Sequence, residues 1–207
     1  IDEKKTFEAI SAVVPEETLA ALTTGGPLKC AGIEDLWMLL QYRLMTIQED
    51  ELAAIFSVTE GLENRIKGAF RQADSVRGLI RSVKTKRYTE TRIQRIMMHV
   101  LAGLTKDKMH LFLETDRALY ARVLAMSGNG ADLLRRIKKS GCASIPILTN
   151  INREAPACPE TRELLAFDIL AADIYNLATG ADRYRRSDYI VKPYHPGTIH
   201  ASSSKKD

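Results

Sequence analysis

A dense group of positive charges leads into a long apolar helix pattern in LIRSVKTKRYTETRIQRIMMHVLAGL, residues Leu79–Leu104. In the second half of this stretch, apolar residues recur at intervals of three and four, which is the period of one helix face. The apolar positions are Ile93, Ile96, Met97, Val100, Leu101 and Leu104. Thr89 precedes them and belongs to the residue types that commonly occupy a helix N-cap. The stretch therefore predicts a buried helix from Thr89 to Leu104, entered through a basic loop.

Helical periodicity extends over most of the remaining chain. After a first helix beginning at Pro15, further helices are predicted at residues 33–47, 49–56, 59–70, 74–80, 105–113, 132–139 and 159–180. Thr59 is expected to cap the helix that ends at residue 70. On the last helix, the predicted buried stripe consists of Leu164, Phe167, Leu170, Ala171, Ile174 and Leu177. Residues 145–148 form either a short strand or an extended segment, so we expect a mainly α fold: an irregular helical domain with one or two short strands at most.

The length of the chain suits one domain or two small ones, at roughly 100–200 residues per domain. Of its 207 residues, 45% are hydrophobic and 27% are charged, which are ordinary values for a globular protein. We expect residues 1–188 to form the helical domain, and residues 189–207, with two prolines and a Ser-rich end, to form an extended, partly disordered tail. The first residue is Ile1 rather than Met, which predicts that the chain is a piece of a longer protein.

The net charge of +4 is concentrated in one window of the sequence. Residues 77–96 contain seven Lys or Arg residues and one acid, a local net charge of +6. The rest of the chain holds 23 basic and 25 acidic residues, so its net charge is −2. A charge excess confined to one segment is typical of a surface that meets a polyanion.

Several classes of chemistry find no support in the sequence. It contains no phosphate-binding G-x-x-x-x-G-K-[ST] loop, no G-x-G-x-x-G and no G-x-S-x-G element. Asp168 and Asp173 are five residues apart and do not share a helix face, and the four histidines form no H-x-x-x-H pair. We therefore expect no catalytic residue and no metal site. Three widely spaced cysteines suit reduced thiols in a cytoplasmic protein, and no apolar run reaches the roughly 18 residues of a membrane span.

The basic window supplies a candidate nucleic-acid-binding surface. Helix N-termini present unpaired N–H groups and a partial positive charge, which suit phosphate. Threonine hydroxyls at the same end can donate to phosphate oxygens, and a tyrosine can stack on a base. The candidate residues are Lys84, Lys86, Arg87, Tyr88, Thr89, Arg92 and Arg95. Because cations in the first turn oppose the helix dipole, we expect these cations to project outward and to have an anionic partner.

Two plainer interpretations of the same residues stay open. The segment can be a solvated charged loop, or its cations can pair with acids of a neighbouring domain. An independent helical regulator or DNA-binding protein is disfavoured, because no helix-turn-helix pattern with a polar recognition helix occurs in the sequence.

Three short motifs resemble a known family. In chain order they are VTEGLENRI (Val58–Ile66), KTKRYT (Lys84–Thr89) and TRIQR (Thr91–Arg95), and they resemble the bacterial tRNA(Met) cytidine acetate ligases. Their order and spacing are specific, and a weaker likeness extends over most of the chain. The resemblance implies that a full-length member uses ATP to activate acetate as acetyl-adenylate and then acetylates N4 of the wobble cytidine in elongator tRNA(Met).

The resemblance also implies a division of labour within such a protein. Adenylate formation, with ATP and Mg²⁺ as cofactors, belongs to an N-terminal Rossmann-like nucleotidyltransferase domain with an H-x-G-H motif, and this chain contains no such motif. The chain is therefore expected to be a C-terminal domain without a cofactor of its own, which binds and positions tRNA. The alternative is an interdomain module whose basic loop completes the nucleotide site of the missing domain. The expected partners are tRNA and that nucleotidyltransferase domain.

Overall fold

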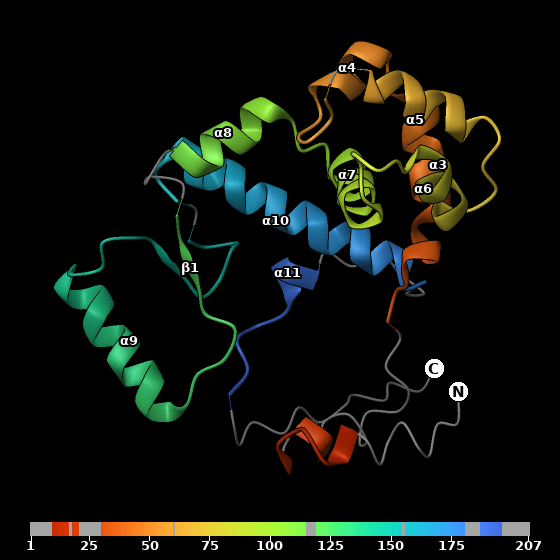
Figure 1. Ribbon diagram of the computed structural model, residues 1–207. Helices are drawn as coiled ribbons and strands as arrows, with labels where there is room; N and C mark the ends of the chain where they lie inside the picture. The colour runs from red at the N-terminus through yellow and green to blue at the C-terminus, as the bar shows by residue number, and fades with distance from the viewer. Residues whose placement is uncertain are drawn as a thin grey trace, which may run out of the picture.

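The protein's structure, a computed structural model, describes residues 10–16, 18–20, 30–59, 61–114, 119–154, 156–180 and 187–195. The first half of the described chain is a bundle of short helices. These are the 3₁₀ helix η1 (Ile33–Leu36) and the α-helices α3 (Trp37–Thr46), α4 (Glu49–Ala54), α5 (Leu62–Phe70), α6 (Val76–Val83), α7 (Glu90–Ala102) and α8 (Lys106–Glu114). Figure 1 shows α7 in the middle of this group, with α3, α5 and α6 on one side and α8 on the other.

Helix α7 forms the middle of the main hydrophobic core. Its buried residues are Ile93, Ile96, Met97 and Val100, none of which has exposed surface. They belong to the same core cluster as buried residues of α3 and α6, which both contact α7. Gly103 ends the helix with a φ of 64°, the left-handed conformation that glycine adopts without strain. The apolar period of the sequence therefore correctly predicted this helix and its buried face.

Lysine side chains close the ends of two helices in this bundle. Lys67 donates from Nζ to the carbonyl oxygens of Leu44 (2.8 Å) and Ile47 (2.5 Å), where α3 ends. Lys106 donates in the same way to the carbonyl oxygen of Ala53, at 2.7 Å, where α4 ends. The last carbonyl groups of a helix have no hydrogen-bond partner within the helix and carry partial negative charge. A lysine ammonium group supplies both a hydrogen-bond donor and a compensating positive charge. Part of the chain's positive charge is therefore structural.

The second half contains a small α/β unit built on a pair of parallel strands. Its elements are β1 (Ala121–Arg122), α9 (Gly128–Ser140), β2 (Ile147–Leu148), α10 (Pro159–Ala178) and α11 (Ser187–Ile190). In the strand pair, Ala121 lies opposite Ile147. Parallel strands need a long crossover connection, and α9 provides it. A second hydrophobic core forms where Leu148 of β2 meets Leu165 and Ile169 of α10.

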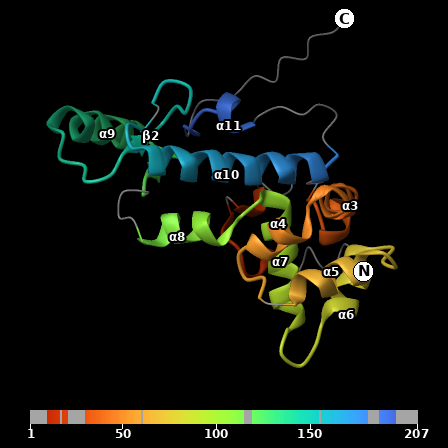
Figure 2. The same ribbon diagram turned by 90° about the horizontal axis from the view of Figure 1, so that it is seen from above.

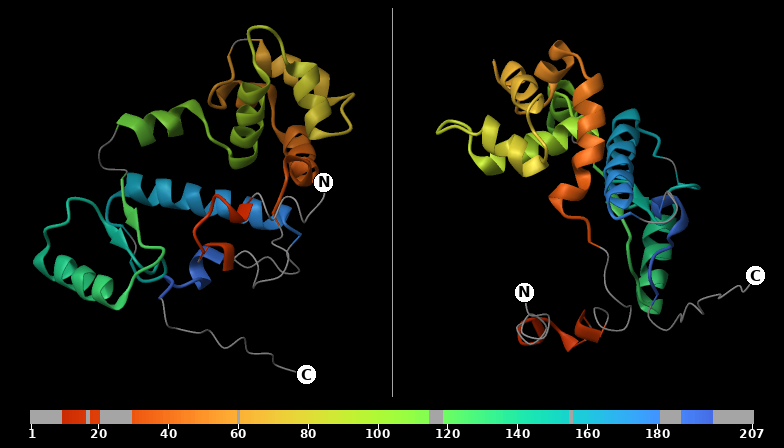
Figure 3. Two further views of the ribbon diagram at one scale, coloured as in Figure 1. Left: turned by 60° about the horizontal axis from the view of Figure 1, so that its bottom comes forward. Right: turned by 90° about the vertical axis from the view of Figure 1, so that its right-hand side faces the viewer.

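Helix α10 joins the two halves of the molecule. It contacts α7 and α8 of the bundle and also α11 of the α/β unit. Figure 2 shows it running between the two groups of elements, and the views in Figure 3 show the same arrangement from two further directions. The rings of Phe112 on α8 and Phe167 on α10 lie 5.7 Å apart between centroids. Helix α10 is therefore the element through which the bundle and the α/β unit pack together.

The predicted mainly α fold is confirmed, with one small parallel sheet in the described part of the chain. The segment at residues 145–148 does contain a strand, β2, whereas β1 was not predicted. Because the two strands and α9 form a β–α–β unit, the second half has α/β rather than purely helical character. None of the helices that the structure describes is both long and apolar enough to cross a membrane.

The buried face of α10 differs from the predicted one. The most buried positions of this helix are Thr161, Leu165, Ile169 and Asp173, spaced four residues apart. The predicted stripe places Leu170 and Leu177 inside, whereas these residues are 44% and 49% exposed. The prediction followed apolar residues alone, and the observed row begins and ends with a polar side chain. A search for apolar periodicity therefore passes over it.

The last described segment extends the fold past the predicted domain end. Tyr189 lies in α11 and packs against the second core. Tyr194 forms a parallel bridge with Ala125. Its N–H donates to the carbonyl oxygen of Leu124, and its own carbonyl oxygen accepts from the N–H of Met126, both at 2.9 Å. The predicted tail thus begins with residues that pack and pair, and its Ser-rich end lies outside the described residues.

Candidate functional site

The basic segment, residues Lys84–Arg95, joins the end of α6 to the first turns of α7. Its loop projects from the molecule on the side away from α10 (Figure 2). Of the seven predicted binding residues, Tyr88 and Arg92 are half-buried. The exposed ones are Lys84, Lys86, Arg87, Thr89 and Arg95. One loop and the first turns of one helix therefore carry all seven.

Arg65 fixes the point at which this loop leaves α6. Its Nε donates to the carbonyl oxygen of Val83 at 2.8 Å, and its Nη2 donates to that of Ser82 at 3.3 Å. The guanidinium thus covers the carbonyl end of α6. Within the loop, the N–H of Thr85 donates to the carbonyl oxygen of Tyr88, and the N–H of Tyr88 donates to the Thr85 hydroxyl, both at 3.0 Å. These bonds close a tight turn whose two central residues are exposed cations.

Two guanidinium groups lie over the ring of Tyr88. The guanidinium carbons of Arg92 and Arg87 lie 5.1 Å and 5.5 Å from its ring centroid. Its hydroxyl is hydrogen-bonded to the Thr59 hydroxyl at 2.8 Å. The prediction that Thr59 caps α5 was wrong: the N-cap is Gly61, whose φ of 80° favours glycine. In the structure the Tyr88 ring lies under two guanidinium groups, and its stacking on a base stays a prediction.

The cations of the basic segment differ in whether the protein supplies a carbonyl acceptor or an acidic partner for their positive charge. Arg92 donates from Nη2 to the carbonyl oxygen of Ser57 at 3.3 Å and is half-buried, so it does not project freely as the sequence predicts. Lys84 lies 3.4 Å from Glu90 in an exposed ion pair, an interaction that contributes only about 0–1 kcal/mol. Within the described part of the chain, the exposed cations of the segment without an acidic partner are Lys86, Arg87 and Arg95.

The N-terminus of α7 adds unpaired donors to this surface. Thr89 occupies the N-cap position, as predicted, but its side chain makes no capping hydrogen bond. First-turn N–H groups of a helix have no partner within the helix and favour anions. Exposed cations, an exposed hydroxyl and these N–H groups therefore lie next to one another, an arrangement suited to phosphate.

A second candidate site lies at the carboxyl ends of the two parallel strands. Ligands of α/β folds commonly bind at this edge, where the loops leaving the strands surround them. The structure has a cavity of about 200 Å³ there, lined by the strand ends, the loop after β2, and α11 with the residues after it. Its lining includes Arg122, Leu124, Asn150, Ile151, Asn152 and Lys192. The sequence did not reveal this site, because strands of two residues leave no periodic signal.

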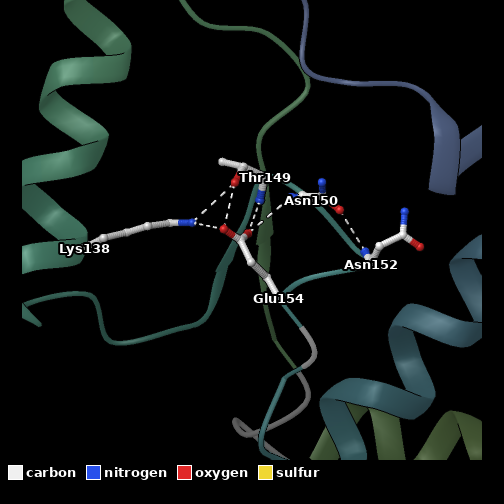
Figure 4. A network of polar contacts seen from close by, with 5 residues as sticks. All are labelled: Lys138, Thr149, Asn150, Asn152 and Glu154. Atoms are coloured by element: carbon white, nitrogen blue, oxygen red, sulfur yellow. Dashed lines mark hydrogen bonds and ion pairs between the residues drawn. The ribbon is translucent and has the colours of Figure 1, made fainter.

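Glu154 holds the loop after β2 in place. Its carboxylate accepts hydrogen bonds from Lys138 Nζ at 2.5 Å, from the Thr149 N–H at 2.5 Å and from the Thr149 hydroxyl at 2.8 Å (Figure 4). The N–H of Asn150 donates to the same carboxylate at 3.3 Å. Burial raises the pKa of Glu154, but the hydrogen bonds from Lys138, Thr149 and Asn150 outweigh it and hold the pKa at about 2. The carboxylate therefore stays ionised and keeps the loop fixed.

We expect this loop to loosen only in acid. Because folding lowers the pKa of Glu154 from 4.5 to about 2, its stabilisation is complete above pH 4.5 and is lost as the pH falls through about 2. The NMR signals of the Thr149 and Asn150 amides should follow that titration. Glu154→Gln should remove the pH dependence and speed amide exchange in the loop at neutral pH. Loop signals that already titrate well above pH 4.5 in the wild-type chain would contradict this assignment.

Arg122, the last residue of β1, is a fixed positive group beside the cavity. Its Nη2 lies 2.9 Å from an Asp188 carboxylate oxygen, and the two side chains are only 25% and 18% exposed. The hydrogen bond to Asp188 raises the pKa of Arg122 despite its burial. Nearby, the Tyr120 hydroxyl donates to Asp168, and burial together with this bond raises the pKa of Tyr120. Among the described residues, no group of three or more His, Cys, Asp or Glu side chains could hold a metal ion.

Comparison with known proteins relates the chain to nucleotidyl transferases. A family model described as HIGH nucleotidyl transferase matches residues 1–189. The tRNA(Met) cytidine acetate ligase of Alkaliphilus metalliredigens is 34% identical over 189 residues, which is 88% of this chain and 43% of the relative. The protein of the same name from Bacillus velezensis is 39% identical over 145 residues, 70% of this chain and 33% of the relative. The chain spans less than half the length of these curated relatives.

A solved protein shares the fold. The crystal structure of Thermotoga maritima TmcAL in its apo form I matches with a TM-score of 0.76 and 24% identity, over 93% of this chain and 48% of that chain. The form II structure of the same protein, bound with alpha-thio ATP, also matches with a TM-score of 0.76 and 24% identity. At this identity, the likeness establishes that this chain and that protein have a common fold.

The family match corrects one part of the sequence interpretation. The missing H-x-G-H motif led to the expectation of a C-terminal domain without a cofactor, separate from any nucleotidyltransferase. The model that matches residues 1–189 is itself described as a nucleotidyl transferase, so this separation is not supported. The absence of one four-residue motif therefore does not separate this chain from the family. The resemblance to the tRNA(Met) cytidine acetate ligases is confirmed by the named relatives.

Proposed function

The chain belongs to the HIGH nucleotidyl transferase family, and from this membership we propose that it is part of an ATP-dependent tRNA(Met) cytidine acetate ligase. Its curated relatives carry that name. In the proposed reaction, acetate attacks ATP to give acetyl-adenylate and pyrophosphate. The N4 amine of a tRNA cytidine then attacks the acetyl carbonyl and releases AMP. Within this enzyme, we assign the basic segment to phosphates of the tRNA.

The observation that carries this assignment is the group of exposed cations without an acidic partner: Lys86, Arg87 and Arg95. They lie on a loop that projects outward and on the first turns of α7. Small-molecule sites are concave and enclose most of their ligand. A projecting surface instead suits a long polyanion, whose successive phosphates each take up one cation and release bound counterions. RNA is a ligand of that kind.

A second candidate ligand for the same cations is the triphosphate of ATP. It is favoured by the nucleotidyl transferase family match, and by the fact that a protein with the same fold was solved with alpha-thio ATP. In that arrangement the basic segment would face a nucleotide held elsewhere in the enzyme. If the cations bind tRNA, removing them should lower the affinity of the chain for tRNA. If they bind ATP, removing them should leave that affinity unchanged.

We expect Lys86→Gln, Arg87→Gln and Arg95→Gln together to weaken tRNA binding by the 207-residue chain and to flatten its salt dependence. Each lost phosphate contact should remove about 0.7–0.9 from the slope of log K against log salt, so three contacts remove roughly 2–3. Filter-binding titrations of a tRNA(Met) transcript at several salt concentrations measure this slope. Arg92 is left unchanged because its guanidinium donates to the carbonyl oxygen of Ser57 and lies over the Tyr88 ring.

The control carries the same loss of charge at scattered exposed positions: Arg71→Gln, Arg136→Gln and Arg162→Gln. If tRNA binding depends on the basic segment, this control should change the slope much less than the first variant. Equal effects of the two variants would mean that net charge alone governs binding. An unchanged slope in the first variant would remove the basic segment from the tRNA interface.

A further inference from the structure

The cavity at the carboxyl ends of β1 and β2 has hydrogen-bonding groups that the fold leaves unused. The Oδ1 atom of Asn150 accepts from the N–H of Asn152 at 3.0 Å, whereas its Nδ2 has no partner among the described residues. The Nδ2 of Asn152 donates to the carbonyl oxygen of Tyr189 at 2.7 Å, and its Oδ1 likewise has no described partner. Figure 4 shows the two Asn side chains next to each other on the loop. Because both residues line the cavity, one amide donor and one amide acceptor without a described partner belong to its wall.

The walls and size of the cavity suit a planar heterocycle. Apolar surface comes from Leu124, Leu148 and Ile151, which line it together with the asparagines. Its volume of about 200 Å³ is at the small end for ligand sites, which commonly run from about 300 Å³. A nucleobase combines flat apolar faces with donors and acceptors on its edge, and Asn side chains pair well with such edges.

The charge of the cavity limits how many phosphates it can take. Arg122 is neutralised by Asp188 at 2.9 Å, so the exposed Lys192 is the remaining positive charge among the lining residues. One lysine can balance one phosphodiester. A triphosphate needs several cations and usually a metal ion, and the described residues contain no cluster of metal-ligating side chains.

The loop that carries the asparagines is held in place before any ligand arrives. Glu154 ties it to α9 through Lys138, and the N–H groups of Thr149 and Asn150 donate to the same carboxylate. A site that is already ordered loses less conformational freedom on binding, so weak contacts contribute more to affinity.

From these observations we propose that the cavity binds one unpaired nucleotide of RNA, with Asn150 and Asn152 contacting the edge of the base and Lys192 its phosphate. The choice of RNA as the source of this nucleotide rests on the proposed function. Bases of single-stranded RNA can turn out of the stack and be recognised on their edges. The cavity would therefore recognise a loop nucleotide, while the basic segment contacts the phosphate backbone.

The test is an NMR titration of the full 207-residue chain, observed at the side-chain amide signals of Asn150 and Asn152. The probes are the four ribonucleoside 5′-monophosphates, ATP, a short single-stranded RNA and a fully paired RNA duplex. We expect saturable shifts with at least one monophosphate and with the single-stranded RNA, and none with the duplex. ATP should bind no more than tenfold tighter than AMP.

The decisive variant is Asn150→Asp, which keeps the Oδ1 acceptor for Asn152 but removes the unused donor. It should weaken monophosphate binding at least about fivefold, the lower end for loss of a side-chain contact to a base edge. Asn129→Asp makes the same change on α9, outside the cavity lining, and should leave affinity within about twofold, as expected for a remote exposed position.

Three outcomes would overturn the proposal: no shift with any monophosphate or with single-stranded RNA, equal weakening by Asn129→Asp, or ATP binding more than tenfold tighter than AMP. The last would make the cavity a triphosphate site. Monophosphates are too small to need the basic segment, so their titration remains interpretable even if that segment does not bind tRNA. Conversely, tRNA binding that depends on the basic segment, with a silent cavity, would overturn this inference alone.

Discussion

Ile96→Asp is expected to unfold the helical bundle. Ile96 has no exposed surface and lies in the main core cluster on α7. Removing its side chain forfeits packing worth about 2–5 kcal/mol. Placing a carboxylate in an apolar core adds a desolvation cost of several kcal/mol more, and the sum approaches the roughly 5–15 kcal/mol stability of a whole domain. The circular dichroism spectrum of this variant should lack the helical signal, and its thermal melting curve should lack a cooperative transition.

Two other positions on α7 provide graded controls for this substitution. Leu101 is half-buried against the edge of the core, so Leu101→Asp should destabilise the protein by less than Ile96→Asp does. Gln94 is exposed, and Gln94→Asp should change the free energy of unfolding by no more than about 0.5 kcal/mol. A melting temperature shared by Ile96→Asp and Gln94→Asp would show that α7 does not bury this face.

The helical bundle could be predicted because its information is local. The apolar residues of α7 recur at helical spacing, and Gly103 follows the last turn, so propensity, period and termination agree. Ser75, a residue type favoured at helix N-caps, caps α6: its hydroxyl accepts from the Gly78 N–H at 3.1 Å. Each of these sequence signals lies within a few residues of the helix or helix end that it predicts.

The roles of charged and polar residues depended on contacts that are distant in sequence. Arg65 covers the end of α6 from 18 residues away, and Thr59 holds Tyr88 from 29 residues away. No periodicity links such pairs, so the sequence predicts Thr59 as a cap of α5 and does not reveal its bond to Tyr88. The sequence identifies Arg65 only as part of a motif that resembles a known family, whereas in the structure its guanidinium donates to carbonyl oxygens at the end of α6, next to the basic loop.

The cavity was missed for a different reason. Each of its two strands has two residues, and the strands pair across a crossover that includes α9. The residues Asn150 and Asn152 look like ordinary loop residues until the strand pair places them at a common edge. On α10, apolar periodicity likewise does not mark the buried row, because Thr161 and Asp173 lie on that row. Tertiary packing selected that row against the apolar stripe of the sequence.

In the full-length ligase to which we propose this chain belongs, substitution of the exposed cations of the basic segment is expected to impair tRNA acetylation but not acetyl-adenylate formation. Lys86→Gln, Arg87→Gln and Arg95→Gln together remove three exposed cations. A loss of roughly 2–3 in salt slope corresponds to a fall in tRNA affinity on the order of a hundredfold at about 0.15 M salt. Acetylation of subsaturating tRNA should fall by the same factor, mainly through a higher KM, because the cations contact bound tRNA in ground and transition states alike.

Acetyl-adenylate formation, measured as pyrophosphate release from ATP and acetate without tRNA, should remain at its wild-type rate. The scattered charge control with Arg71→Gln, Arg136→Gln and Arg162→Gln should leave both half-reactions close to wild type, since a tRNA contact is a local property. If pyrophosphate release falls as far as tRNA acetylation, the cations serve the phosphates of ATP, and the second candidate ligand replaces the first. If neither half-reaction changes, the basic segment is a solvated surface and the concentration of charge between residues 77 and 96 has no bearing on catalysis.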